Sequence, residues 1–72
     1  NYGIQLRPEK LDYMKFKSLL NNHLNGSNKI IFKFILDGNE IEVESYENYK
    51  IDLDFMDKIK SVKGIIDFKK IN

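Results

Sequence analysis

Few residues of this chain could perform acid–base or nucleophilic chemistry. Its 72 residues include one histidine, His23, and no cysteine. Nucleophilic catalysis by a hydroxyl group needs a base within reach and a third group that orients the base, and the sequence offers no such set. His23 falls late in a predicted helix, where a surface position favoured by the helix dipole is the simplest interpretation. The sequence therefore predicts no catalytic residue and no ligand role for His23.

Three aspartates raise the possibility of a calcium or magnesium site, because hard cations prefer clustered carboxylates. They are Asp52, Asp54 and Asp57. Their spacing does not fit the EF-hand loop, since Met56 and Asp57 stand where that loop needs an oxygen ligand and then a glycine. Acidic residues early in a helix also favour the positive end of its dipole, so we interpret these three as helix-capping residues. The sequence predicts no metal site and no cofactor.

Phosphate chemistry is not supported either. The four glycines are isolated, and Lys63 with Gly64 lacks the rest of a Walker sequence. A small enzyme of the acylphosphatase type would need a phosphate cradle between Arg7 and the first helix, where Pro8 removes an amide donor. Twelve basic and eleven acidic side chains give a net charge of +1, so the chain as a whole does not favour polyanions. We expect neither enzymatic activity nor a small-molecule substrate.

A first helix is predicted between Pro8 and Asn25. Pro8 suits the first helical position, and no further proline or glycine occurs before Gly26. Asn25 and Gly26 supply the left-handed residues that commonly close a helix, and the polar stretch up to Asn28 predicts a loop. Apolar side chains at helical spacing predict a core-facing stripe, made of Tyr13, Phe16, Leu19, Leu20 and Leu24.

A β-hairpin is predicted over residues 29–46. Apolar side chains alternate along residues 29–36, turn-forming residues follow at 37–39, and residues 40–46 alternate again. A two-residue loop pairs even positions of the first strand with odd positions of the second. The expected neighbours are Phe34 and Leu36 with Ile41 and Val43 on one face, and Lys33 with Glu42 and Glu44 on the other.

A second helix and two outer strands complete the pattern. Asp52 or Asp54 can cap the helix, and Gly64 stands where it should stop. Its predicted buried stripe is Phe55, Met56, Ile59 and Val62. Residues 65–71 alternate enough to predict a last strand, and residues 2–6 predict a short first strand.

Residues 1–72 therefore form one predicted α+β domain with the order strand, helix, strand, strand, helix, strand. This βαββαβ order is the split βαβ or ferredoxin-like arrangement, in which two helices cover one face of a four-stranded, mainly antiparallel sheet. Right-handed crossovers are expected to place the first and third strands at the centre and to leave residues 29–36 on an edge. That edge is expected to stay open to partners.

Two sets of residues are candidates for contact with a partner. Ile31, Lys33 and Ile35 lie on the open face of the expected edge strand, and an edge strand can accept a strand from another protein. The alternative is that an upstream domain or lysine stems cover these isoleucines. Around the first helix, the candidate nucleic-acid contacts are Lys10, Lys15 and Lys17, for which a solvated helix face is the alternative.

RNA-recognition domains share the predicted strand order and stack bases on aromatic residues of their two central strands. Here the third strand would present Glu40, Glu42 and Glu44 on the open face, where it would repel phosphates. These glutamates are interpreted as solvated, lysine-paired carboxylates. The sequence therefore does not predict RNA recognition through the sheet.

Taken end to end, the chain resembles the last domain of the bacterial C-family replicative polymerase, the alpha subunit of DNA polymerase III. The stretches that carry the resemblance are "GIQLRPEKLDYMKFKSLLNNHLNG", "NKIIFKFILDGNEIEVES" and "YKIDLDFMDKIKSVKGIIDFKKI". They are similar to that domain's short strand and leucine-bearing helix, its hairpin, and its entry into a short helix before a terminal strand. The chain has "HLNG" and Leu53 where the family often has a proline.

The resemblance implies a non-catalytic role, because the family's magnesium-binding aspartates lie far upstream of this domain. It also implies contact with the tau subunit of the clamp loader and with upstream polymerase domains, near single-stranded template. The chain opens at Asn1 and not at a methionine, so we expect it to be the C-terminal part of a longer polypeptide. The alternative function is a nucleic-acid-binding module that uses the lysines around the first helix.

The cytoplasm is the expected location. The absence of cysteine agrees with a reducing compartment. No apolar run approaches the roughly 18–20 residues of a membrane span, and no basic-then-apolar leader marks a secretory signal.

Overall fold

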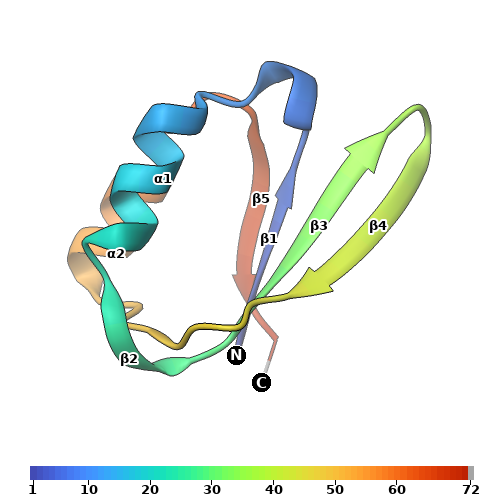
Figure 1. The fold of residues 1–72 in the computed structure, drawn as a ribbon. Coiled ribbons are helices and arrows are strands. Elements are labelled where there is room, and N and C mark those ends of the chain that lie inside the picture. The colour runs from blue at the N-terminus through green and yellow to red at the C-terminus, as the bar shows by residue number, and fades with distance from the viewer. Residues whose placement is uncertain (72) are drawn as a thin grey trace.

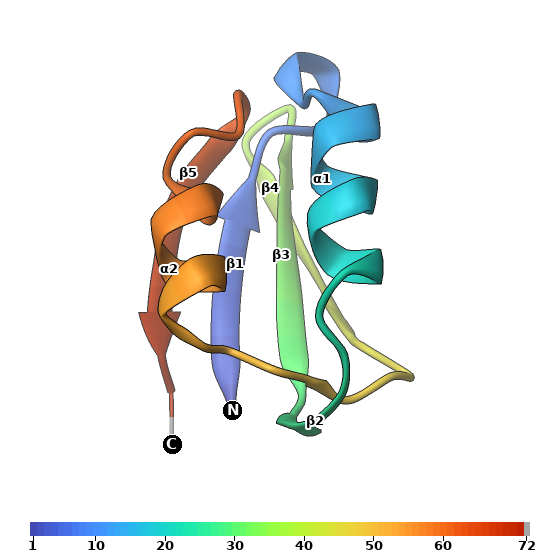
Figure 2. The same cartoon turned by 90° about the vertical axis from the view of Figure 1, so that its left-hand side faces the viewer.

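The computed structural model describes residues 1–71 as two helices packed on one face of a four-stranded sheet (Figures 1 and 2). The elements are β1 (Tyr2–Leu6), a 3-10 turn η1 (Pro8–Lys10), α1 (Tyr13–Asn21), β2 (Leu24–Asn28), β3 (Ile30–Leu36), β4 (Asn39–Glu44), α2 (Leu53–Ile59) and β5 (Ile65–Lys70). Two of the three strand pairings in the sheet are antiparallel, and the β1–β3 pairing is parallel. The predicted α+β class, with two helices and a mainly antiparallel sheet, is confirmed.

The place of the hairpin in the sheet differs from the prediction. The sheet order is β4-β3-β1-β5, so β3 lies inside the sheet and β4 forms its edge. The central place of the first strand is confirmed, whereas the predictions of residues 29–36 as an edge strand and of residues 40–46 as a central strand are wrong. The reason lies in the side chains. β3 has Ile31 and Ile35 on the face away from the helices in addition to the apolar residues toward them, whereas β4 carries a glutamate at every second position from Glu40.

The hairpin itself has the predicted turn and register. Asp37 and Gly38 form the two-residue turn, and both adopt the left-handed conformation that such a turn requires. Phe34 pairs with Ile41, and Lys33 pairs with Glu42. The Lys33 ammonium lies 4.0 Å from the Glu42 carboxylate. The apolar and the charged faces therefore match as expected.

The first helix begins later than predicted. Pro8 starts only the short 3-10 turn, after which Leu11 is extended and the Asp12 carboxylate caps α1 by accepting the backbone N–H of Lys15 at 3.1 Å. Tyr13, expected in the core stripe, is instead the first residue of the helix and is 60% exposed. Phe16 and Leu19 are buried as predicted.

The first helix ends at Asn21, before Leu24, which was predicted in its buried stripe. Residues from Leu24 through the predicted loop form β2, an extended segment outside the sheet. Leu24 and Asn28 each form an isolated bridge with Tyr49. Lys50 donates its backbone N–H to the carbonyl oxygen of His23 at 2.7 Å, and Gly26 donates to the carbonyl of Asn48 at 3.3 Å. Residues 23–28 and 48–50 thus form a clamp that ties the end of α1 to the approach of α2.

The second helix and the core follow the sequence closely. The Asp52 carboxylate accepts the backbone N–H of Phe55 at 2.9 Å and caps α2. Met56, expected in the buried stripe, is only half-buried. The buried apolar cluster joins strands, helices and the clamp, and consists of Ile4, Leu6, Phe16, Leu19, Ile30, Tyr49, Phe55, Ile59 and Val62.

Ser45 is a buried residue directly after β4, at the end of the β3–β4 pair that lies away from the hairpin turn. Its hydroxyl accepts the backbone N–H of Ile30 at 3.0 Å and donates to the carbonyl of Glu47 at 2.8 Å. Replacing Ser45 with alanine leaves the Ile30 N–H without this acceptor, so we expect a loss of about 1–3 kcal/mol in the free energy of unfolding, measured by urea denaturation.

The matched control for Ser45 is Ser61→Ala. The Ser61 hydroxyl also donates to a backbone carbonyl, that of Lys58 at 2.8 Å, but it is exposed and water can replace it. We expect a change within about 0.5 kcal/mol. Equal effects of the two substitutions would show that the buried hydrogen bonds of Ser45 contribute nothing special.

Two features concern the chain as a whole. The backbone N–H of Ile71 donates to the carbonyl of Asn1 at 2.9 Å, so the two ends of the described chain lie side by side (Figure 1). No helix within residues 1–71 is long and apolar enough to cross a membrane.

Candidate functional site

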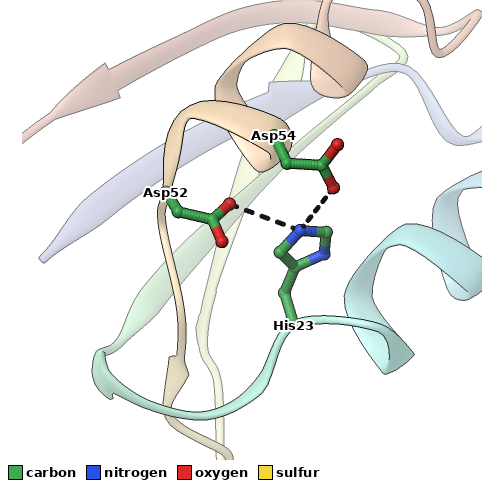
Figure 3. Close-up of side chains that lie close together, drawn as sticks. All are labelled: His23, Asp52 and Asp54. Carbon is green, nitrogen blue, oxygen red and sulfur yellow. Dashed lines mark hydrogen bonds and ion pairs between the residues drawn. The ribbon is translucent and has the colours of Figure 1, made fainter.

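One histidine and two aspartates converge between the end of α1 and the start of α2 (Figure 3). The Nε2 atom of His23 lies 3.0 Å from Oδ2 of Asp54 and 3.4 Å from Oδ1 of Asp52. One potential ligand atom from each of the three residues lies within 4.8 Å of the other two. We call these three residues the His23 cluster.

The clamp between residues 23–28 and 48–50 positions the His23 cluster. It holds His23 just beyond the last turn of α1 and leads the chain directly from Lys50 into Asp52. Gly26 makes this approach possible, because a Cβ atom there would overlap the backbone carbonyl of Tyr49 and the nitrogen of Lys50. This close backbone contact therefore brings the end of α1, with His23, near the segment that carries the two carboxylates.

The imidazole itself is buried and held from its other side. His23 is 5% exposed, and its ring packs edge-on against the ring of Phe55 with centroids 5.3 Å apart. Its Nδ1 atom lies 2.7 Å from the carbonyl oxygen of Leu19. A carbonyl oxygen only accepts hydrogen bonds, so Nδ1 must carry the proton of this bond. The Nε2 atom is consequently the one that faces the carboxylates.

The two aspartates are about half exposed, and each has a second partner. The Asp52 carboxylate caps α2, as the sequence predicted. The Lys58 ammonium lies 3.2 Å from Oδ1 of Asp54. The hydrogen bond from Lys58 lowers the pKa of the Asp54 carboxyl below its ordinary value, against a raising effect of burial, and the charge of Lys58 and the bond with His23 lower it further. Asp54 is therefore an anion at neutral pH.

The prediction of His23 as a surface residue was wrong, whereas the prediction of Asp52 as a helix cap was confirmed. His23 is a buried residue in contact with two carboxylates and not a surface residue at a helix end. The spacing of Phe16, Leu19 and His23 is the signal that could have revealed this, because positions three and seven residues after Phe16 share its face of a helix. The third aspartate, Asp57, is exposed and lies outside the cluster.

A second candidate site is the edge strand β4 with the cleft beside it. Figure 1 shows the β3–β4 hairpin inclined away from α1. A cleft of about 440 Å³ lies between α1 and β3, the neighbour of β4. Ile41 and Val43 of β4 are 53% and 48% exposed. The aromatic and aliphatic side chains that line the cleft include Tyr13, Phe16, Leu20, Phe32 and Phe34.

The predicted protein contacts lie on the opposite face of the sheet from this cleft. Ile31, Lys33 and Ile35 alternate with the buried Ile30 and its apolar neighbours, so they point away from the helices. All three are half-buried. They occupy the face that the sequence predicted, but on an internal strand and not at an edge.

The structure does not bring the predicted nucleic-acid contacts into one site. Lys10, Lys15 and Lys17 line three different clefts. The Lys15 ammonium donates to the carbonyl of Ser61 at 3.3 Å, and the Lys17 ammonium lies 5.9 Å from the centre of the Tyr13 ring. The three lysines therefore do not line one common cleft.

Comparison of the chain with protein-family models, with curated proteins and with solved structures finds no match.

Proposed function

We propose that this domain is a non-catalytic protein-interaction domain, of the kind that ends the alpha subunit of bacterial replicative polymerases, and that it contacts the tau subunit of the clamp loader. The sequence resemblance suggests the partner. The observation that carries the proposal is the combination of a free sheet edge at β4 with an uncovered apolar surface next to it.

The backbone of β4 is suited to accept another strand. Leu36 and Asn39 flank the two-residue turn and form a hydrogen-bonded pair, after which such pairs alternate along an antiparallel ladder. The backbone groups of Glu40 and Glu42 therefore point to the free side of β4. An edge of this kind can pair with an extended segment of a partner, whose side chains then decide the specificity.

The side chains of β4 define which segment would fit. Glu40, Glu42 and Glu44 point to the face of the sheet away from the helices, while Ile41 and Val43 lie on the same face as Phe34 and Phe32, which line the cleft. A complementary strand has basic residues opposite the glutamates and apolar residues opposite Ile41 and Val43. A second copy of β4 paired antiparallel would instead place glutamates against glutamates.

The same charges favour a protein over a nucleic acid at this surface. Phosphates would meet the three glutamates of β4, and the lysines around α1 line separate clefts. Nucleic-acid binding through Lys10, Lys15 and Lys17 therefore has less structural support than protein contact.

The proposal is tested by titrating the domain with the tau subunit at two salt concentrations, for the original chain and for Ile41→Lys. We expect saturable binding that depends weakly on salt, and at least a tenfold weaker affinity for Ile41→Lys, since the lysine places a charge in the apolar part of the contact. The control is Ile66→Lys on β5, which changes an apolar side chain of similar exposure at the opposite edge of the sheet.

Three outcomes would contradict parts of the proposal. Absence of tau binding would refute the choice of partner. Equal losses for Ile41→Lys and Ile66→Lys would refute the choice of surface. Binding of a single-stranded oligonucleotide that weakens steeply with salt, without tau binding, would move the function to the lysines around α1.

A further inference from the structure

We propose that His23, Asp52 and Asp54 bind a divalent transition-metal ion, for which zinc has the best chemical fit. This inference concerns a different part of the molecule from the β4 edge and does not depend on the proposed function. It rests on how the buried imidazole is held, on the spacing of the three ligand atoms and on the exposure of the aspartates.

The first step is the orientation of the imidazole. Because Nδ1 of His23 donates its proton to the carbonyl of Leu19, a neutral ring has a bare lone pair on Nε2. That lone pair points at two carboxylates, which have no proton to donate. For a neutral ring such an arrangement is repulsive, and either a proton on Nε2 or a metal cation between the three groups removes the repulsion. A histidine whose other nitrogen donates to a backbone carbonyl is also the usual form of a metal ligand.

The second step is the spacing. Two ligand atoms that lie about 2.0–2.1 Å from a zinc ion at the tetrahedral angle are about 3.3–3.4 Å apart. The distances from Nε2 of His23 to the facing oxygens of Asp54 and Asp52 are 3.0 and 3.4 Å, close to this spacing. The two carboxylate oxygens lie within 4.8 Å of each other, and both side chains are exposed enough to adjust around an ion. Asp54 uses Oδ2 here, while its Oδ1 atom faces Lys58.

The third step is the type and number of ligands. One imidazole and two carboxylates favour a transition metal over calcium or magnesium, which take oxygen ligands. Three protein ligands leave a fourth tetrahedral position for water, and the two aspartates are 55% and 53% exposed at the surface. A cleft of about 430 Å³ between the helices also adjoins His23.

The competing explanation is that a proton takes the place of the metal. An imidazolium would donate Nε2–H to Asp54 and would satisfy the same geometry without any ion. The two explanations differ in their response to zinc, because a protonated ring cannot coordinate a metal and a metal-bound ring carries no proton on Nε2.

The test is a titration of the tag-free chain with zinc chloride, followed by calorimetry and by thermal unfolding. The chain has one histidine and no cysteine, so competing zinc ligands are few. We expect one zinc ion per chain. At a zinc concentration ten times the Kd, we expect a rise in Tm of about 5–10 °C, which magnesium chloride does not reproduce.

Variants of the exposed aspartates keep the test independent of folding. Asp54→Asn is expected to weaken zinc binding at least tenfold, and so is Asp52→Asn, in which asparagine preserves the helix cap. The control Asp57→Asn removes an exposed carboxylate of the same helix outside the cluster and is expected to bind zinc as the original chain does.

Nitrogen NMR of His23 gives the second readout. Zinc is expected to change the signal of Nε2 while the Nδ1 proton is retained. A proton that stays on Nε2 at saturating zinc, zinc binding that Asp54→Asn and Asp57→Asn affect equally, or the absence of saturable binding would overturn the proposal.

Discussion

Replacing Phe55 with alanine is expected to remove most of the stability of the domain. Phe55 is fully buried, and its ring packs against Phe68 and His23 with centroids 5.6 and 5.3 Å away. Truncation of a buried phenylalanine costs about 3–5 kcal/mol, through lost burial and the cavity left behind. A core of this size supplies a net stability of roughly 3–5 kcal/mol, so a large unfolded fraction is expected in water.

Circular dichroism with urea denaturation measures this effect. The control is Leu53→Ala, which shortens an apolar side chain in the same helix that is 83% exposed. Its expected change is within about 0.5 kcal/mol. A loss below about 1.5 kcal/mol for Phe55→Ala would mean that the surrounding side chains close the cavity, and that Phe55 is not the centre of the core.

Gly26→Ala is expected to have the second largest effect, although it adds only one methyl group. That methyl would overlap backbone atoms of Tyr49 and Lys50, which cannot turn away as a side chain can. The clamp must open, and its hydrogen bonds from Lys50 to His23 and from Gly26 to Asn48 weaken or break. Strain and lost hydrogen bonds together predict a loss of about 3 kcal/mol in the free energy of unfolding.

The control for Gly26 is Gly38→Ala in the hairpin turn. Gly38 has a positive φ, but a Cβ atom there would meet nothing within 4 Å. Its cost is therefore only that of the left-handed backbone, about 1–2 kcal/mol. Backbone NMR shifts distinguish the two, because Gly26→Ala should disturb residues 23–28 and 48–52 and Gly38→Ala only the turn. Shifts confined to Gly26 and its immediate neighbours would show that the clamp tolerates the methyl group.

The elements with strong local signals were predictable from the sequence. The hairpin has left-handed residues at 37 and 38 and matching apolar and charged faces, which together permit only one register. The second helix has a capping aspartate before its apolar stripe. In both cases residues close together in the sequence determine the local structure.

The strand order and the His23 cluster were harder to predict because they depend on contacts between distant residues. The split βαβ order places the first strand next to the strand of residues 40–46, whereas here β1 pairs with the strand before it, β3. The apolar residues on both faces of β3 indicated an internal position but were interpreted as an open surface. The contact of His23 with Asp52 and Asp54 requires the clamp. No local sequence pattern predicts that residues 23–28 pack against residues 48–50.

The hydrogen bond between Ile71 and Asn1 has a consequence for the connectivity of the domain. Because β1 and β5 are antiparallel neighbours, the chain enters and leaves the sheet at the same end (Figure 1). A short flexible connector could join these ends and make a circular permutant without crossing the core. New ends at the exposed turn of residues 37–38 would then separate β3 and β4 in sequence while every sheet neighbour stays the same.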